Sequence, residues 1–145
     1  MIKRYKTALI TGAASGIGLS ILKKLSKNNL KIYALDKNKK KLIKICKETN
    51  SIPIHLDLSD VDLLYSKLSK LNVDILVSNA GIGNGIMGLL KSSKKDISNS
   101  TKINLESVLH LLKILVPKML KKRNGHIFLI GSIAGLYPTD SVIYS

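Results

Sequence analysis

The sequence is poor in residues that cross-link a chain or bind metals. It has one cysteine, Cys46, among 145 residues, so an internal disulfide is excluded, and with it the small secreted domains that disulfides hold together. Cys46 falls within a predicted helix, where a small core residue is commoner than a nucleophile. The histidines, His55, His110 and His126, lack the spacing of metal ligands. We predict no metal site.

Long apolar runs are also missing. Near the N-terminus only residues 7–10 form an apolar run before a glycine-rich turn, and residues 108–116 are interrupted by His110 and Lys113. Both are far shorter than the roughly 18 uninterrupted apolar residues that a membrane-spanning helix requires. Without an export signal or a span, we expect a cytoplasmic location and no membrane partner.

Acidic residues are few: 9 Asp and Glu stand against 24 Lys and Arg, a formal net charge of +15. Such a charge raises a nucleic acid or another polyanion as a partner. The lysines are scattered along the chain without interleaved aromatic residues, which favours a solvated surface. We expect no nucleic-acid partner, and a DNA affinity that falls steeply with salt would contradict this.

The apolar residues indicate one folded domain over residues 1–145. They make up 45% of the chain, which excludes a disordered chain. They alternate between short runs typical of buried strands and helical spacing. The predicted strands are residues 6–11, 31–35, 51–56, 73–77 and 126–130. Four helices are predicted. The first follows the glycine turn, the second spans 39–48 with Leu42, Ile43 and Ile45 inward, the third begins after a Ser59 cap, and the fourth spans roughly 100–123.

This alternation predicts an α/β fold with a doubly wound parallel sheet of the Rossmann type. Parallel strands need crossover connections, and the doubly wound arrangement gives the strand order 3-2-1-4-5. The loop 82–88 is expected to be irregular, and Pro117 to kink the last helix. That helix is predicted to carry one broad apolar face, made of Leu105, Val108, Leu109, Leu112, Leu115, Val116 and Met119.

A glycine-rich turn, residues 11–18, follows the first predicted strand and precedes a helix. At such a turn the helix N-terminus offers free N–H groups to a pyrophosphate, and glycine lets the backbone approach it closely. An ordinary βα loop that binds nothing is the alternative interpretation. The candidate cofactor-binding residues of this turn are Thr11, Gly12, Ser15, Gly16, Ile17 and Gly18.

Asp36 ends the second predicted strand, where a carboxylate can accept both ribose hydroxyls of an adenosine. Its other possible role is the N-cap of the following helix. Because a carboxylate repels a 2′-phosphate, Asp36 favours NAD over NADP as the cofactor. The adjacent Lys37 softens that preference.

Polar residues also end the third and fourth predicted strands. Asp57 and Leu58 follow one, and Asn79, Ala80 and Gly81 follow the other. Open α/β sheets bind ligands at the carboxyl ends of their strands, so all five are candidate cofactor-binding residues. Turn formation is the alternative role for Asp57 and Asn79.

Taken in order, these motifs resemble the classical short-chain dehydrogenase/reductase family over the whole chain. The residues that carry the resemblance are Thr11-Gly12-x-x-x-Gly16-Ile17-Gly18, Asp57-Leu58, Asn79-Ala80-Gly81, Asn104, Gly131-Ser132-Ile133-Ala134-Gly135 and Tyr144. Ser78 departs from the Asn that family members often have before Asn-Ala-Gly. The interval from Ser132 to Tyr144 is slightly shorter than the commonest family spacing.

The resemblance implies three catalytic residues. Tyr144 would exchange a proton with an alcohol or carbonyl oxygen while a hydride moves to or from the nicotinamide. Ser132 would hydrogen-bond that oxygen, and Asn104 would hold a water of a proton relay. Their other roles, taken singly, are a surface tyrosine, a strand-end turn and a polar residue near a helix start.

The resemblance also implies an oxidoreductase that acts on a small-molecule alcohol or ketone. It further implies a homo-oligomer formed through the long helix around Leu105 to Met119. A non-catalytic nucleotide-binding or interaction module is the alternative function.

The family's Tyr-x-x-x-Lys motif would place its lysine three residues beyond Ser145. Family members also continue through another helix, two more strands and a substrate-binding lid. We therefore expect this chain to be a truncated dinucleotide-binding part that lacks the C-terminal strands and the lid.

Assayed alone, the 145-residue chain is expected to show no appreciable dehydrogenase activity. Without the family's lysine, nothing nearby in the sequence stabilises a tyrosinate at Tyr144, so the phenol stays protonated at neutral pH and is a poor base. General acid–base catalysis is typically worth about 10²–10⁴-fold. Rates with NAD and secondary alcohols should equal those of a Tyr144→Phe variant; turnover that this substitution abolishes would contradict the prediction.

Overall fold

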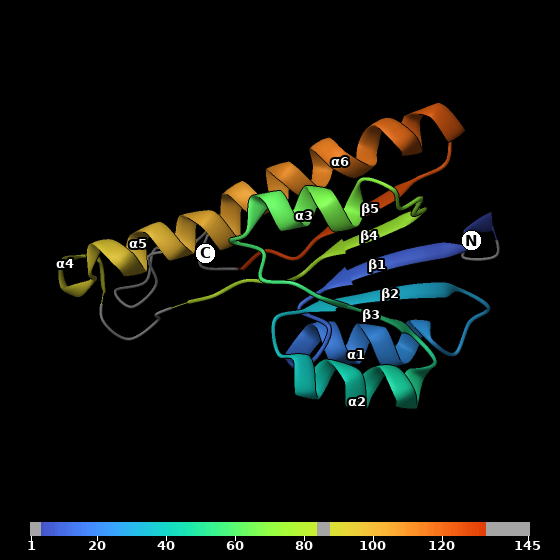
Figure 1. The fold of residues 1–145 in the computed structure, drawn as a ribbon, viewed down its shortest axis with the longest axis horizontal. Helices are drawn as coiled ribbons and strands as arrows, with labels where there is room; N and C mark the ends of the chain where they lie inside the picture. Colours follow the sequence, from blue (N-terminus) through green and yellow to red (C-terminus); the bar gives the residue numbers. More distant parts are fainter. Residues whose placement is uncertain (1–3, 84–87, 133–145) are drawn as a thin grey trace.

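A five-stranded parallel sheet lies between two layers of helices in the computed structural model, which describes residues 4–83 and 88–132 (Figure 1). Its strands are β1 (Thr7–Thr11), β2 (Lys31–Asp36), β3 (Ile52–His55), β4 (Ile75–Ser78) and β5 (His126–Leu129). Their order in the sheet is β3-β2-β1-β4-β5, and every neighbouring pair is parallel. The predicted doubly wound order is confirmed.

The helices divide between the two faces of the sheet. In Figure 1, α1 (Gly16–Leu25) and α2 (Lys39–Thr49) lie on one face, and α3 (Val61–Leu68) and α6 (Ser107–Lys122) on the other. Before α6 come α4 (Gly88–Lys91), α5 (Lys94–Thr101) and a π-helical turn, Lys102–Glu106. None of the helices in the described ranges is long and apolar enough to cross a bilayer.

The continuous apolar runs of the central strands follow from burial on both faces. Along β1, Ala8 and Ile10 pack against α1 and α2, whereas Leu9 packs against α3 and α6; all three are fully buried. Cys46 belongs to the α1–α2 side of the core, as predicted, and burial raises the pKa of its thiol although a hydrogen bond with Ser51 opposes this. The thiolate is therefore disfavoured.

The long helix begins earlier than predicted. Ser93 and Asp96 form a capping box in which the Ser93 hydroxyl accepts from the Asp96 N–H at 3.1 Å, so α5 starts at Lys94. The helix then continues through the π turn into α6, which ends at Lys122 and is followed by the C-cap Arg123 in the left-handed conformation. Pro117 lies inside α6 without ending it.

The apolar face predicted for this helix is only partly the buried one. Leu115 and Met119 are buried as predicted, but Leu105 and Leu109 are each 56% exposed, and the sheet is instead covered by Leu111 and Ile114. The reason is that α6 carries apolar residues on two sides. Spacing alone does not tell which side faces the sheet.

Two further expectations are wrong, and a third differs only at its last described residue. The N-cap of α3 is Asp60, whose carboxylate accepts from the Leu63 N–H at 2.9 Å, while Ser59 is occupied with Asp57. Ile43 is 40% exposed rather than inward. The loop predicted over 82–88 gives way at Gly88 to the short helix α4, and residues 84–87 are outside the described ranges.

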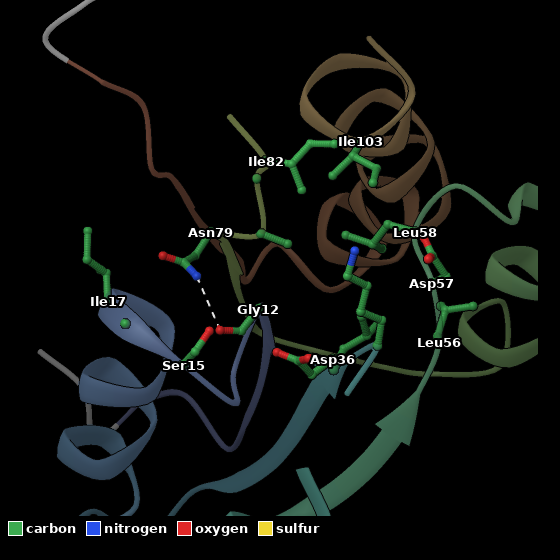
Figure 2. Close-up of a pocket in the computed structure, with 15 residues that line it drawn as sticks. Gly12, Ser15, Ile17, Asp36, Leu56, Asp57, Leu58, Asn79, Ile82 and Ile103 are labelled. Atoms are coloured by element: carbon green, nitrogen blue, oxygen red, sulfur yellow. Dashed lines mark hydrogen bonds between the residues drawn. The ribbon is translucent and has the colours of Figure 1, made fainter. Parts of the chain in front are cut away.

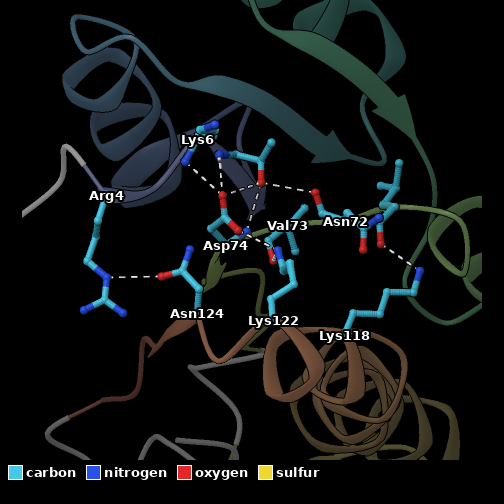
Figure 3. Close-up of polar contacts among 10 residues, drawn as sticks. Arg4, Lys6, Asn72, Val73, Asp74, Lys118, Lys122 and Asn124 are labelled. Atoms are coloured by element: carbon cyan, nitrogen blue, oxygen red, sulfur yellow. Dashed lines mark hydrogen bonds and ion pairs between the residues drawn. The ribbon is translucent and has the colours of Figure 1, made fainter.

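At the amino ends of the strands, Asp74 joins β1, β4 and α6 (Figure 3). One carboxylate oxygen, Oδ2, accepts from the backbone N–H of Lys6 at 2.9 Å and of Thr7 at 3.1 Å. The other, Oδ1, pairs with the Lys122 ammonium at 2.5 Å. Burial raises the pKa of Asp74, but the hydrogen bonds from Lys122, Lys6 and Thr7 lower it more, so its pKa lies below the ordinary value.

Replacing Asp74 with Ala is expected to destabilise the fold by roughly 1–3 kcal/mol, because the Lys6 and Thr7 N–H groups lose their carboxylate acceptor. A carboxyl with a lowered pKa in the folded state contributes stability above its unfolded pKa, which is lost as the pH falls through the folded pKa. Urea unfolding of wild type and Asp74→Ala should therefore differ most above about pH 4 and converge below it. A constant difference down to pH 2 would contradict this.

Candidate functional site

The carboxyl ends of β1, β2 and β4 and the segment after β3 surround a pocket of about 440 Å³ (Figure 2). In the sheet, β1 lies between β2 and β4, and the strand order reverses there. The pocket lies at this switch point. In Figure 2, Gly12 and Ser15 lie on one side of Asp36, and Leu56, Asp57 and Leu58 on the other. The lining residues are Gly12, Ser15, Gly16, Ile17, Leu35, Asp36, Lys37, Leu56, Asp57, Leu58, Asn79, Ala80, Gly81, Ile82 and Ile103.

Each glycine of the βα turn meets a different steric demand. Gly12 and Gly16 have positive φ angles, 65° and 52°. A Cβ on Gly18 would lie 2.2 Å from the Gly12 carbonyl oxygen, so α1 can approach the turn only without a side chain there. A Cβ on Gly16 would meet nothing within 4 Å. Gly18 is therefore needed for packing, and Gly16 leaves open space at the start of α1.

Thr11 and Asn79 tie the turn to the end of β4. The Thr11 hydroxyl oxygen accepts from the backbone N–H groups of Asn79 and Ala80, both at 3.0 Å. The Asn79 side chain donates in return to the Thr11 carbonyl at 3.0 Å and reaches the Gly12 carbonyl at 3.5 Å. Thr11 does not line the pocket, and its hydroxyl fixes the residues that do.

Asp36 is held by the backbone on two sides. Its Oδ2 accepts from the Ala14 N–H at 2.9 Å and its Oδ1 from the Asn38 N–H at 2.8 Å. A carboxylate has about four lone-pair sites, so acceptor capacity remains toward the pocket. The N-cap of α2 is Asn38, which accepts from the Lys41 N–H, so the alternative role of Asp36 as that cap is wrong.

Asp57 and Lys37 put opposite charges at the far end of the pocket. Asp57 accepts from the Ser59 N–H at 3.0 Å and from its hydroxyl at 2.8 Å, so it does form the turn that was its alternative role. Burial raises the pKa of Asp57, but the Ser59 hydrogen bonds and the nearby charge of Lys37 lower it below the ordinary value. Asp57 is therefore a carboxylate at neutral pH.

Asn104 holds the loop after β4 instead of lining the pocket. Its Oδ1 accepts from the Ile82 N–H and its Nδ2 donates to the Ile82 carbonyl, both at 2.8 Å. Asn104 lies in the π turn, a feature that occurs often at functional sites because it interrupts the regular backbone bonding. Asn104 therefore does not line the pocket itself, but it binds Ile82 and follows Ile103 in the sequence, and both of these residues line it.

Of the other two predicted catalytic residues, the described part of the chain includes only Ser132. Ser132 is exposed after β5 and is not among the lining residues. Tyr144, together with Ile133, Ala134 and Gly135 of the family motif, lies outside the described residues. Within the described part of the chain, no group of three or more His, Cys, Asp or Glu side chains is arranged to hold a metal ion.

Sequence reasoning missed the apolar walls of the pocket. Leu35, Leu56, Ile82 and Ile103 line it, although the sequence marks the first two only as strand residues. The sequence did contain a signal for Leu35 and Leu56, because each directly precedes an aspartate at the end of a predicted strand. Ile82 and Ile103 come together through Asn104, which no local pattern announces.

The open parallel sheet, the glycine turn between β1 and α1 and the pocket at the switch point together define a Rossmann-type nucleotide-binding fold. The family described as short chain dehydrogenase matches residues 6–145. The chain belongs to this short-chain dehydrogenase family.

Individual proteins agree with this. The chain is 37% identical over 144 residues to an uncharacterized short-chain type dehydrogenase/reductase, y4eK, of Sinorhizobium fredii, a match that covers 99% of this chain and 58% of the relative. A 3-oxoacyl-[acyl-carrier protein] reductase of Brucella melitensis with bound NAD superposes with a TM-score of 0.86 at 29% identity, covering 94% of this chain and 57% of the other. A metagenomic short-chain oxidoreductase in complex with NADP gives 0.90 at 27%, covering 96% and 68%.

Two facts about these relatives bear on this chain. It spans a little over half the length of the curated relatives that it matches. Of the two solved relatives just described, one carries NAD and the other NADP, so nicotinamide cofactors of both kinds occur among proteins similar to this chain.

Alanine substitutions should separate the two glycines. Gly18→Ala is expected to destabilise the chain by roughly 1–3 kcal/mol, because its Cβ would overlap the Gly12 carbonyl. Gly16→Ala should lower the free energy of unfolding by about 1 kcal/mol, because residue 16 has a positive φ. It should nevertheless weaken NADH binding at least as much as Gly18→Ala does, because the new methyl group occupies open space beside the pocket. Urea unfolding and NADH fluorescence titration measure the two effects. Unchanged NADH affinity in Gly16→Ala would contradict a binding role for this turn.

Proposed function

We propose that this chain is the cofactor-binding part of an NAD-dependent oxidoreductase that moves a hydride between the nicotinamide and an alcohol or ketone. The observation that carries the proposal is the pocket at the switch point, with an open glycine turn at a helix N-terminus on one side and the anchored carboxylate of Asp36 on the other. Membership in the family supports the same reaction class.

The residues present fit a dinucleotide. The N-terminus of α1 and the open space beside Gly16 suit a pyrophosphate, since free N–H groups and the helix dipole attract anions there. Asp36 would accept the ribose hydroxyls, and Asp57 and the apolar walls at Leu35 and Leu56 would hold the adenine. When bound, the nicotinamide supplies or accepts the hydride.

Asn104, Ser132 and Tyr144 are proposed as the proton-handling residues of the complete enzyme. Asn104 would act by fixing the Ile82 backbone and presenting the π turn to a water. Ser132 follows β5, which pairs with β4 so that Leu129 lies beside Ser78, and it therefore leaves the sheet at the same edge as the pocket. Tyr144 would hold and transfer the proton of the substrate oxygen.

An assembly through α6 is part of the proposal. Leu105 in the π turn and Leu109 on α6 are each 56% exposed, and Leu120 is 70% exposed; with the partly exposed Val116 they recur at helical spacing along this helix, whereas Leu112 packs against the core. Such a stripe suits a symmetric contact with a second copy in a cytoplasmic homo-oligomer. Sedimentation of the protein at micromolar concentration tests this assembly. A strictly monomeric species, for a full-length protein that contains this segment, would contradict it.

The cofactor preference depends on Asp36. NADH is expected to bind more tightly than NADPH, because a 2′-phosphate would lie against the carboxylates of Asp36 and Asp57. Asp36→Ala should reduce the ratio of the NADPH and NADH dissociation constants about tenfold or more, since it removes both the acceptor for the ribose hydroxyls and the repulsion of the 2′-phosphate. Fluorescence titration of the two reduced cofactors measures the two affinities, with Asp62→Ala, which removes an exposed carboxylate on α3 that does not line the pocket, as a control. Tighter binding of NADPH by the unsubstituted chain would overturn the assignment to NAD.

A further inference from the structure

Asp36, the last residue of β2, and Lys37, in the turn that follows it, both line the pocket. Asp36 is fixed by its bonds to Ala14 and Asn38, as described above. The neighbouring Lys37 lines the pocket, and its charge lowers the pKa of Asp57 across it. How far that charge reaches the ribose depends on how the Lys37 backbone is held.

A residue outside the pocket holds it. His55, the last residue of β3, lies opposite Asp36 in the β2–β3 register, and its Nε2 is 3.1 Å from the Lys37 carbonyl oxygen. Because a carbonyl only accepts, Nε2 carries the proton, and both the neutral Nε2–H tautomer and the imidazolium donate this bond. His55 is exposed and does not itself line the pocket.

We propose that His55 is a positioning residue for cofactor discrimination: by donating to the Lys37 carbonyl it directs the Lys37 side chain toward the 2′ position of the adenosine ribose. The inference rests on the proposed nucleotide-binding function and adds to it a residue that acts without touching the nucleotide. In this proposal the held lysine offsets the repulsion of a 2′-phosphate, while the preference for NAD stays with Asp36.

The two cofactors should respond differently when the hold is lost. NAD relies on Asp36, whose carboxylate is anchored by the Ala14 and Asn38 N–H groups and has no bond to His55. NADP needs a nearby cation to offset repulsion between its phosphate and the carboxylates of Asp36 and Asp57. Freeing the Lys37 backbone spreads its ammonium over more positions, so the NADP complex loses more than the NAD complex.

The experiment titrates the full 145-residue chain with NADH and with NADPH, in wild type, His55→Leu and His55→Gln. Leu removes the donor at similar size, whereas the Gln amide nitrogen can reach the Lys37 carbonyl much as Nε2 does. In His55→Leu the NADPH dissociation constant is expected to rise about two- to tenfold while that for NADH stays within about twofold, the range of one net hydrogen bond. His55→Gln should restore most of the NADPH affinity.

A matched control is His110, whose Nδ1 bonds the Tyr65 hydroxyl at 3.2 Å between α3 and α6, far from the turn. His110→Leu also loses one hydrogen bond but should change neither cofactor affinity. Equal weakening of NADH and NADPH in His55→Leu, or no rescue by Gln, would overturn the positioning role and leave His55 a structural residue. Absence of saturable binding of either cofactor to wild type would instead overturn the proposed function.

Discussion

The pairing of β1 with β4 is the contact on which the rest of the structure depends. At the amino ends of the two strands, the buried carboxylate of Asp74 accepts from β1 backbone N–H groups and pairs with Lys122. At the carboxyl ends, the Thr11 hydroxyl accepts from the Asn79 N–H directly after β4, and the Asn79 side-chain amide donates to the Thr11 carbonyl. Polar groups buried at both ends are costly unless paired, so these bonds specify one register between strands far apart in the sequence.

That register determines where the pocket forms. β1 has β2 on one side and β4 on the other, and the connections from these strands run to opposite faces of the sheet (Figure 1). The crevice between the diverging connections receives the glycine turn from β1, Asp36 from β2 and Asn79 from β4. The two layers of helices then cover the sheet with separate apolar clusters, so the site lies at an edge that neither layer closes.

Local patterns in the sequence were enough to predict the strands and the positions of the glycine turn and Asp36, because each depends on spacing within a few residues. The strand order followed from the alternation of strands and helices along the whole chain and from the doubly wound arrangement that it implies. The long helix shows where this fails: α6 is apolar on two sides, and only its packing on the sheet distinguishes Leu111 from Leu109. The partner of Asn104 could not be predicted either, since Ile82 is distant in sequence and an amide side chain carries no information about which backbone group it will bind.

The close packing at Gly18 also has a kinetic consequence. Because α1 packs against the Gly12 carbonyl and the Asn79 side chain donates to the Thr11 carbonyl beside it, the turn has its shape in the absence of a ligand. A ligand that binds against this turn would not have to order it, so the conformational entropy that a disordered turn would lose is absent from the binding free energy. Association at this end of the pocket is then governed by diffusion and by the charges around the entrance, not by a slow rearrangement of the backbone.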